Sequence, residues 1–210
     1  MGNAVSETKQ LAVLVIAGLI LGIIGIVLIS SVPPLFEGNL VVDSYDAVLY
    51  ENGTLTERYT YDVRISGEYR MLFRFWEAPL TFGPGSAPCV QFVSATPHPG
   101  TIGYAKDEGG NVNVIGAAEN SSAKATISNL AEKNEVGIFK PDYFNQGKYT
   151  VSYSYILHPP IEYDSTTSHL NLKFAGAGHI PYRNVRITVP VNQVEQVFVY
   201  PPALDTARIG

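Results

Sequence analysis

The sequence predicts a mostly β protein in which one N-terminal transmembrane helix precedes an antiparallel β-sandwich of the immunoglobulin-like kind. Three observations predict this class. Residues 11–32 contain no charged residue, apolar and polar residues alternate with period two through much of the remaining chain, and clusters of Gly, Pro and Asn separate the alternating segments. Many short strands of this kind are typical of two stacked sheets whose inner faces bury apolar side chains.

The apolar segment 11–32 is long enough to span a membrane, because about 20 residues at 1.5 Å per residue cross a ~30 Å hydrocarbon core. It is longer than the centre of a signal peptide and lacks a small-x-small cleavage site, which favours an uncleaved anchor in the lipid bilayer. Lys9 precedes the segment and acidic residues follow it, so the positive-inside tendency predicts a cytoplasmic N-terminus. We therefore expect a single-pass protein with a cytoplasmic stub at 1–10, a membrane helix at 11–32, a linker at 33–39 and an extracytoplasmic domain at 40–210.

Three glycines lie on this expected helix. Gly18 and Gly22 form a G-x-x-x-G pair, and Gly25 follows one turn later. Small residues at this spacing let a second helix approach closely in a membrane. The pattern predicts a helix-packing surface.

Beyond the proline pair that ends the apolar segment, the chain predicts strands. Between the alternating segments 39–50 and 54–65, Asn52-Gly53 is a strong signal for a tight hairpin turn. Further strands are expected at 69–76, 89–93, 111–115, 135–139, 147–157, 169–174, 184–191 and 194–200, and a short helix within 121–134. The segment 80–111 is rich in Gly and Pro, and we expect it to hold long loops or an interaction edge.

Composition narrows the function classes. The net charge is −5 and no basic stripe is present, which argues against binding of nucleic acid. Cys89 is the only cysteine, so no intramolecular disulfide can form, and we expect it to be a small buried residue. An exported domain without disulfides depends on its core, which the 13 Tyr and 9 Phe residues can supply.

No catalytic signature emerges from the sequence, and we expect no cofactor. A divalent metal site would require neighbouring strands to bring His158, His169 and Asp164 together, but no H-E-x-x-H motif supports one. His98 and His179 likewise belong to no motif. We therefore expect the histidines to face solvent or lie in turns, and we assign no catalytic or metal-binding residue.

Two sets of residues are candidates for contacts at the surface. Arg70 and Arg74 alternate with apolar residues just before Trp76, a pattern that fits a cation–π contact or a partner-binding edge, with internal packing as the alternative. Asn52 and Asn120 each begin an Asn-x-Ser/Thr sequon on a predicted turn. Both are possible glycosylation sites in an exported protein.

The chain contains, in order, a Gly turn, a strand with Glu and an aromatic pair, and a Gly-x-Tyr-Arg segment: Gly53, Glu57, Tyr59, Tyr61, Gly67, Tyr69 and Arg70. This order of motifs resembles the first half of a family of predicted membrane proteins of bacteria and archaea, the domain-of-unknown-function 2207 family. Its second half is matched by the strands of 147–160 and 169–191. The family usually has a Trp near the position that Phe174 occupies here. The resemblance implies an exported sandwich attached to the membrane and no known activity.

A second, shorter resemblance concerns the first residues. Gly2, Asn3 and Glu7 before an apolar helix resemble the processing site of archaeal type IV pilins, although Lys9 interrupts the pattern. Taken together, the sequence predicts a non-enzymatic structural or protein-interaction role in the cell envelope, with other membrane or envelope proteins, or its own copies, as partners. Two alternatives stay open: a pilin-like filament subunit and an exported metal-dependent hydrolase.

Overall fold

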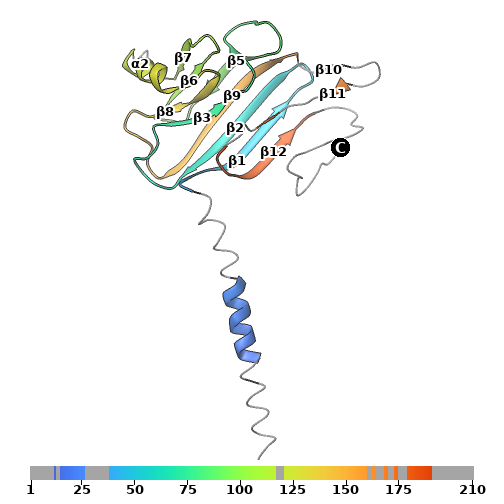
Figure 1. The fold of residues 1–210 in the computed structure, drawn as a ribbon, viewed down its shortest axis with the longest axis vertical. Helices are drawn as coiled ribbons and strands as arrows, with labels where there is room; N and C mark the ends of the chain where they lie inside the picture. Colours follow the sequence, from blue (N-terminus) through green and yellow to red (C-terminus); the bar gives the residue numbers. More distant parts are fainter. Residues whose placement is uncertain are drawn as a thin grey trace, which may run out of the picture. The chain divides into compact units, whose positions relative to one another are not determined.

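The structure is a computed structural model that describes residues 12, 15–26, 38–116, 121–159, 162–163, 168–169, 173–174 and 179–190. The chain divides into two compact units, Met1–Asn39 and Leu40–Gly210. The predicted strand at 194–200 lies outside the described residues. The second unit is mostly β, which confirms the general fold class (Figure 1).

The first unit contains a helix over the described residues 15–26. Its apolar side chains are exposed, and a Cβ atom added at Gly18, Gly22 or Gly25 would meet no other atom within 4 Å. Most of the rest of the predicted membrane segment 11–32 lies outside the described residues. Within the described part, no helix has both the length and the apolar character needed to cross a membrane.

Strands β1 (Leu40–Leu49) and β2 (Thr54–Val63) form the predicted hairpin. Gly53 has a φ angle of +84°, a left-handed conformation that glycine adopts without strain. The Asn52 side-chain oxygen accepts a hydrogen bond from the backbone N–H of Thr54 at 3.0 Å. The Asn-Gly signal therefore sets this turn as expected.

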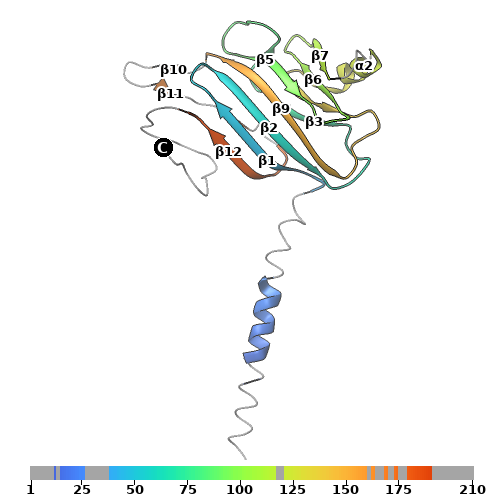
Figure 2. The same ribbon diagram turned by 180° about the vertical axis from the view of Figure 1, so that it is seen from behind.

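The largest sheet has the strand order β12-β1-β2-β9-β5-β4. Figures 1 and 2 show its first five strands side by side. Its other members are β4 (Leu80–Thr81), β5 (Cys89–Thr96), β9 (Gly147–His158) and β12 (Tyr182–Thr188). The central pairs are antiparallel, but β12 pairs with β1, and β4 with β5, in parallel. The prediction of a purely antiparallel sheet is thus wrong at both edges, because side-chain alternation reports burial and carries no information on strand direction.

A second sheet has the order β3-β8-β6-β7 and is antiparallel throughout. It consists of β3 (Met71–Phe75), β6 (Ile102–Lys106), β7 (Val112–Ile115) and β8 (Glu135–Phe139). Strand β6 lies inside this sheet, although the sequence around it predicts loops. Gly103 interrupts its apolar pattern, and a Cβ atom there would be in ordinary contact with Ile115 and Pro97 at 3.4 Å. A short separate pair joins β10 (Glu162–Tyr163) to β11 (Ser168–His169).

The two main sheets share one core. Tyr59 and Tyr153 of the six-stranded sheet belong to the same buried cluster as Leu72, Val136 and Ile138 of the four-stranded sheet. Helix α2 (Ser121–Leu130), which the sequence predicts, packs on the other face of the four-stranded sheet in a second cluster. The layers are therefore sheet, sheet and helix, as Figure 1 shows.

Strand β12 extends the inner face of the six-stranded sheet beyond this core. Val185 pairs with Tyr45 and Ile187 with Ala47, so their side chains share a face with buried residues of β1. Nevertheless Val185, Ile187 and Val189 are 55%, 40% and 39% exposed. The apolar pattern of this strand predicts a common face correctly, but the described part of the four-stranded sheet does not cover it.

Candidate functional site

A buried ion pair joins the two sheets. Glu57 lies in phase with Leu55 and Tyr59 on the inner face of β2, and Arg74 lies in phase with Leu72 on the inner face of β3. The Arg74 Nε atom is 3.0 Å from Glu57 Oε2, and the two side chains are only 5% and 0% exposed. Charges are buried in this way only when they are paired. The pair is thus a fixed tie between the sheets.

Aromatic side chains surround the pair. The Tyr45 hydroxyl donates to Glu57 Oε1 at 2.6 Å, and Arg74 Nε donates to the Tyr59 hydroxyl oxygen at 3.1 Å. The Arg74 guanidinium lies 3.3 Å from the centre of the Trp76 ring. Burial raises the pKa of the Glu57 carboxyl, while Arg74 and the Tyr45 hydrogen bond oppose this rise. Burial also raises the pKa of Tyr45, which keeps its hydroxyl protonated as a donor.

Several buried polar atoms beside the pair have no hydrogen-bond partner in the described part of the chain: Arg74 Nη1, Trp76 Nε1 and the hydroxyls of Tyr153 and Tyr155. Each such atom typically costs about 1–3 kcal/mol when it is left unpaired. Apolar side chains of similar volume often stabilise a core at least as well as a buried ion pair. This polar cluster therefore marks a position at which stability alone does not account for the residues present.

A cleft of ≈ 580 Å³ lies next to the ion pair. Residues of β1, β2 and β3 line it, together with Phe174, Ile180 and Tyr182. Tyr61, Tyr69 and Tyr182 give it a largely aromatic wall, and Arg74 reaches it from the core. Its size and apolar character fit a binding site, since aromatic side chains provide contact area at low entropic cost.

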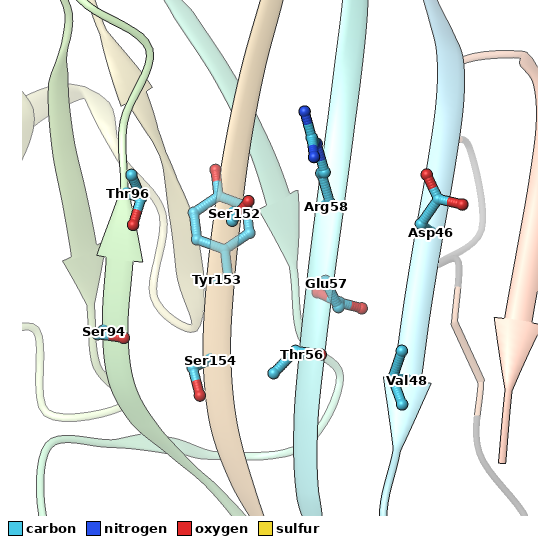
Figure 3. Close-up of a pocket in the computed structure, with 10 residues that line it drawn as sticks. All are labelled: Asp46, Val48, Thr56, Glu57, Arg58, Ser94, Thr96, Ser152, Tyr153 and Ser154. Carbon is cyan, nitrogen blue, oxygen red and sulfur yellow. The ribbon is translucent and has the colours of Figure 1, made fainter. Parts of the chain in front are cut away.

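A second hollow of ≈ 310 Å³ lies on the outer face of the six-stranded sheet (Figure 3). Hydroxyl side chains from neighbouring strands form rows across it, because Thr56 pairs with Ser154 and Ser154 with Ser94. Asp46 and Arg58 face each other in the next row. None of these residues is buried, and no aromatic ring is placed for stacking among the side chains that point outward here. The aromatic cleft is the better candidate for a functional site.

Comparison with known proteins decides the family. The family described as Predicted membrane protein (DUF2207), N-terminal domain, matches residues 41–209. This chain belongs to the DUF2207 family. The match confirms the resemblance read from the motifs, and it places the β domain among predicted membrane proteins.

Other comparisons add little. No curated protein matches the chain. Among solved structures it is similar to an M1 zinc metallopeptidase from Deinococcus radiodurans, with 10% identity, a TM-score of 0.32, and 57% of this chain and 20% of that chain covered. A variant of that enzyme bound to a Tyr-Ser-Ala substrate has 13% identity and a TM-score of 0.36, with 72% of this chain and 33% of that chain covered. The DUF2207 chain thus spans about a fifth to a third of these structures, and at such TM-scores the likeness says nothing about its fold or activity.

The structure places the arginines of the predicted interaction edge differently. Arg74 and Trp76 form the predicted cation–π contact, but both side chains are buried between the sheets. They do not form an exposed partner-binding edge, because position 74 and position 76 face the core. Arg70 is half-buried and lies 5.4 Å and 5.3 Å from the ring centres of Phe139 and Tyr143.

The remaining candidates do not converge. Asn52 is exposed in its turn, and Asn120 lies outside the described residues, as do Gly2, Asn3 and Glu7 of the pilin resemblance. Cys89 is buried, as predicted. His98 accepts a hydrogen bond from the backbone N–H of Thr150, and His158 contacts Gln91. No three His, Cys, Asp or Glu residues of the described chain lie together in a way that could hold a metal, and Asp164 is not among the described residues.

The sequence analysis missed the ion pair, although the sequence places both of its residues at buried positions of their strands. Glu57 sits between Leu55 and Tyr59 at the spacing of the buried face, and the family resemblance already includes it. Arg74 occupies the same kind of position between Leu72 and Trp76. A charged residue in phase with buried neighbours is a signal for an internal partner.

Proposed function

We propose that this DUF2207 chain is a non-enzymatic interaction protein of the cell envelope. In this proposal residues 11–32 anchor it in the membrane as a single span, with a cytoplasmic N-terminus and the β domain outside. The domain is an immunoglobulin-like sandwich whose aromatic cleft binds another membrane or envelope protein.

The cleft is the observation that carries the proposal. Tyr61, Tyr69 and Tyr182 line the cleft. Phe73 and Phe75 border it at the edge of β3 and are 52% and 43% exposed, with their side chains on the α2 side of the sheet. Exposed aromatic side chains grouped at a concave surface are typical of binding sites, whereas single exposed apolar residues are ordinary. Aromatic residues are also enriched at the energetically important centres of protein interfaces.

The charges near the cleft favour binding over catalysis. Arg74 is already paired with Glu57 inside the core, which leaves it little freedom to act on a substrate. At the rim, Lys173 pairs with Glu77 at 2.5 Å, and both side chains are more than half exposed. Solvated pairs of this kind contribute little energy but help to select a partner.

The apolar helix supports attachment to a membrane. Its Leu, Ile and Val side chains are exposed, which is unfavourable in water. The lipid of a membrane can cover them. Gly18, Gly22 and Gly25 leave open space on this helix, which suits the approach of a second membrane helix. The family description as predicted membrane proteins agrees with this assignment.

The proposal is tested by the mass of the complex that the full-length protein forms when extracted from its own membrane in mild detergent. Phe73→Glu places a charge at the cleft, and Val93→Glu places one at a residue of equal exposure, 51%, on β5 and away from the cleft. We expect the wild type and Val93→Glu to retain a partner that Phe73→Glu loses. A complex that survives Phe73→Glu unchanged would contradict the proposal.

A further inference from the structure

We propose that the cleft takes its partner as an extended polypeptide strand, which pairs with the edge of β3 that no described strand occupies. This inference rests on the proposed binding function of the cleft. It adds the class of ligand and the way in which the ligand is held.

One side of the β3 backbone has no strand paired with it among the residues that the structure describes. Among the described strands β3 pairs only with β8, and the flanking bonds from Lys140 N to Arg70 O and from Trp76 N to Asn134 O fix the phase of the ladder. In an antiparallel pair alternate residues bond to the partner strand. Residues 70, 72, 74 and 76 therefore point their backbone groups at β8, while those of residues 71, 73 and 75 point away from it.

These outward backbone groups lie along the cleft. Met71, Phe73 and Phe75 all line it. The Phe73 carbonyl accepts a hydrogen bond from the Tyr61 hydroxyl at 3.4 Å, a long bond that leaves room for a second donor. The N–H groups of the three residues have no hydrogen-bond partner elsewhere in the described part of the chain. A row of three donors at the border of an apolar cleft matches an incoming strand.

The edge of β3 is also poorly defended against pairing. Natural sheets protect their edges with Pro, Lys, bulges or covering segments. The sequence Met-Leu-Phe-Arg-Phe contains neither Pro nor Lys, and the register with β8 runs without a bulge. Its one charge, on Arg74, is compensated by Glu57 and turned into the core. Nothing in β3 itself repels another strand.

A strand added here would meet two different surfaces. Its side chains on one face would enter the cleft between the sheets, near Tyr61 and Tyr182. Those on the other face would lie beside Phe73 and Phe75, whose side chains point to the side of the sheet that carries α2. Because successive side chains of a strand alternate in direction, the ligand should carry apolar residues at every second position.

A second copy of this chain does not satisfy the same site. If β3 of two copies paired, each would offer its inner-facing Leu72 and Arg74 to the cleft of the other. Leu72 and Arg74 are only 1% and 6% exposed because they are buried in their own core. They cannot fill a neighbour's cleft, so β3–β3 pairing of two copies is disfavoured, and we take the ligand to be an extended segment of a different polypeptide.

The test uses the full-length protein in detergent and a displayed library of random ten-residue peptides. We expect the selected peptides to alternate apolar and polar residues. The tightest peptide is then synthesised in two N-methylated forms, offset by one residue, so that only one form blocks the N–H groups that face β3. One form should lose at least about tenfold in affinity and the other less than about threefold, because hydrogen bonds along one edge hold the strand. Equal effects of the two forms, or no selected binder, would overturn the inference.

A matched pair of protein variants tests the hydrogen bonds donated by β3 itself. Phe73→Pro removes an outward N–H without breaking the ladder to β8, and Phe73→Thr removes the ring but keeps the N–H. Peptide binding should be at least about tenfold weaker in Phe73→Pro than in Phe73→Thr when both show the circular dichroism of the wild type. A peptide or small molecule that fills the cleft but ignores both N-methylation and Phe73→Pro would refute strand addition and leave the proposed binding function standing.

Discussion

Glu57 and Arg74 lie on different sheets and meet with an Oε2 to Nε distance of 3.0 Å, and both side chains are buried. Desolvation of two charges costs about as much as their attraction returns, so such a pair is weak evidence of added stability. It does, however, fix which residues of β2 and β3 face each other. Since β3 also forms one wall of the aromatic cleft, the pair holds that wall in place.

Breaking the pair from one side should be costly. Arg74→Met leaves the Glu57 carboxylate buried without its partner, and we expect the free energy of unfolding to fall by about 3–5 kcal/mol. Urea unfolding of the full-length protein, followed through its single Trp, Trp76, measures this change. The double variant Glu57→Leu with Arg74→Met should be more stable than Arg74→Met alone. If the two variants are equally unstable, the unpaired Glu57 carboxylate is not the cause of the destabilisation.

Glu135 gives the stability a defined pH dependence. It accepts hydrogen bonds from the Tyr104 hydroxyl at 2.5 Å and from the Glu132 backbone N–H at 3.0 Å, yet burial raises its pKa above the ordinary 4.5. The folded state therefore holds this proton at pH values where the unfolded chain has lost it. Stability should fall as pH rises from 4.5 through the folded pKa, by at most about 1.4 kcal/mol per pH unit.

The variant Glu135→Gln isolates this effect, because it keeps an acceptor for Tyr104 and cannot ionise. Its unfolding free energy should depend less on pH in that window than that of the wild type. Asp43 acts in the opposite direction: hydrogen bonds from Lys148 and Arg183 lower its pKa, so its contribution is lost only as pH falls below 3.8. Identical pH profiles for wild type and Glu135→Gln would show that Glu135 titrates normally.

Gly137 is required by close packing. A Cβ atom at this position would lie 2.5 Å from the Tyr104 hydroxyl oxygen and 2.7 Å from the backbone oxygen of Leu72. We expect Gly137→Ala to destabilise the domain by about 1–3 kcal/mol, because the neighbouring backbone must move. Gly83→Ala is the matched control, since a Cβ atom there meets nothing within 4 Å. A Gly137→Ala protein with an unchanged melting temperature would contradict this packing.

The proposed topology can be read from cysteine labelling of whole cells. Cys89 is buried and should not react with a membrane-impermeant maleimide. Thr56→Cys, at an exposed position on the outer face of β2, should be labelled on intact cells. Ser6→Cys should be labelled only after the membrane is permeabilised. Labelling of position 6 but not of position 56 on intact cells would reverse the proposed orientation.

Local features of this fold could be predicted from the sequence because local residues determine them. Asn52-Gly53 sets the first hairpin. The strand expected at 135–139 is observed as β8 with the same bounds, Glu135–Phe139. The sequence does not predict β6, because Gly103 within it is typical of a loop, and its contact with Ile115 is known only from the fold. The parallel pairing of β12 depends on a crossover that no periodic pattern encodes.

The site required tertiary information. The position of Glu57 in the alternation of its strand predicts a buried charge, but only the packing of the two sheets shows that Arg74 is its partner. The cleft depends on the edge of β3 lying next to Tyr182, more than 100 residues later in the chain. The alternation around Val185 also predicts a buried face, but these side chains are exposed. How far one sheet extends beyond the other depends on how the two layers overlap, which the sequence pattern does not encode.

The most direct test of the central claim is photochemical crosslinking in the native membrane. A photoreactive benzoylphenylalanine at position 75 lies at the cleft, and the same group at position 93 lies on a different sheet at a similarly exposed residue. We predict that position 75 crosslinks to one segment of a second polypeptide and that position 93 does not. The absence of any crosslink from position 75, or the same products from both positions, would contradict the assignment of this cleft as the binding site.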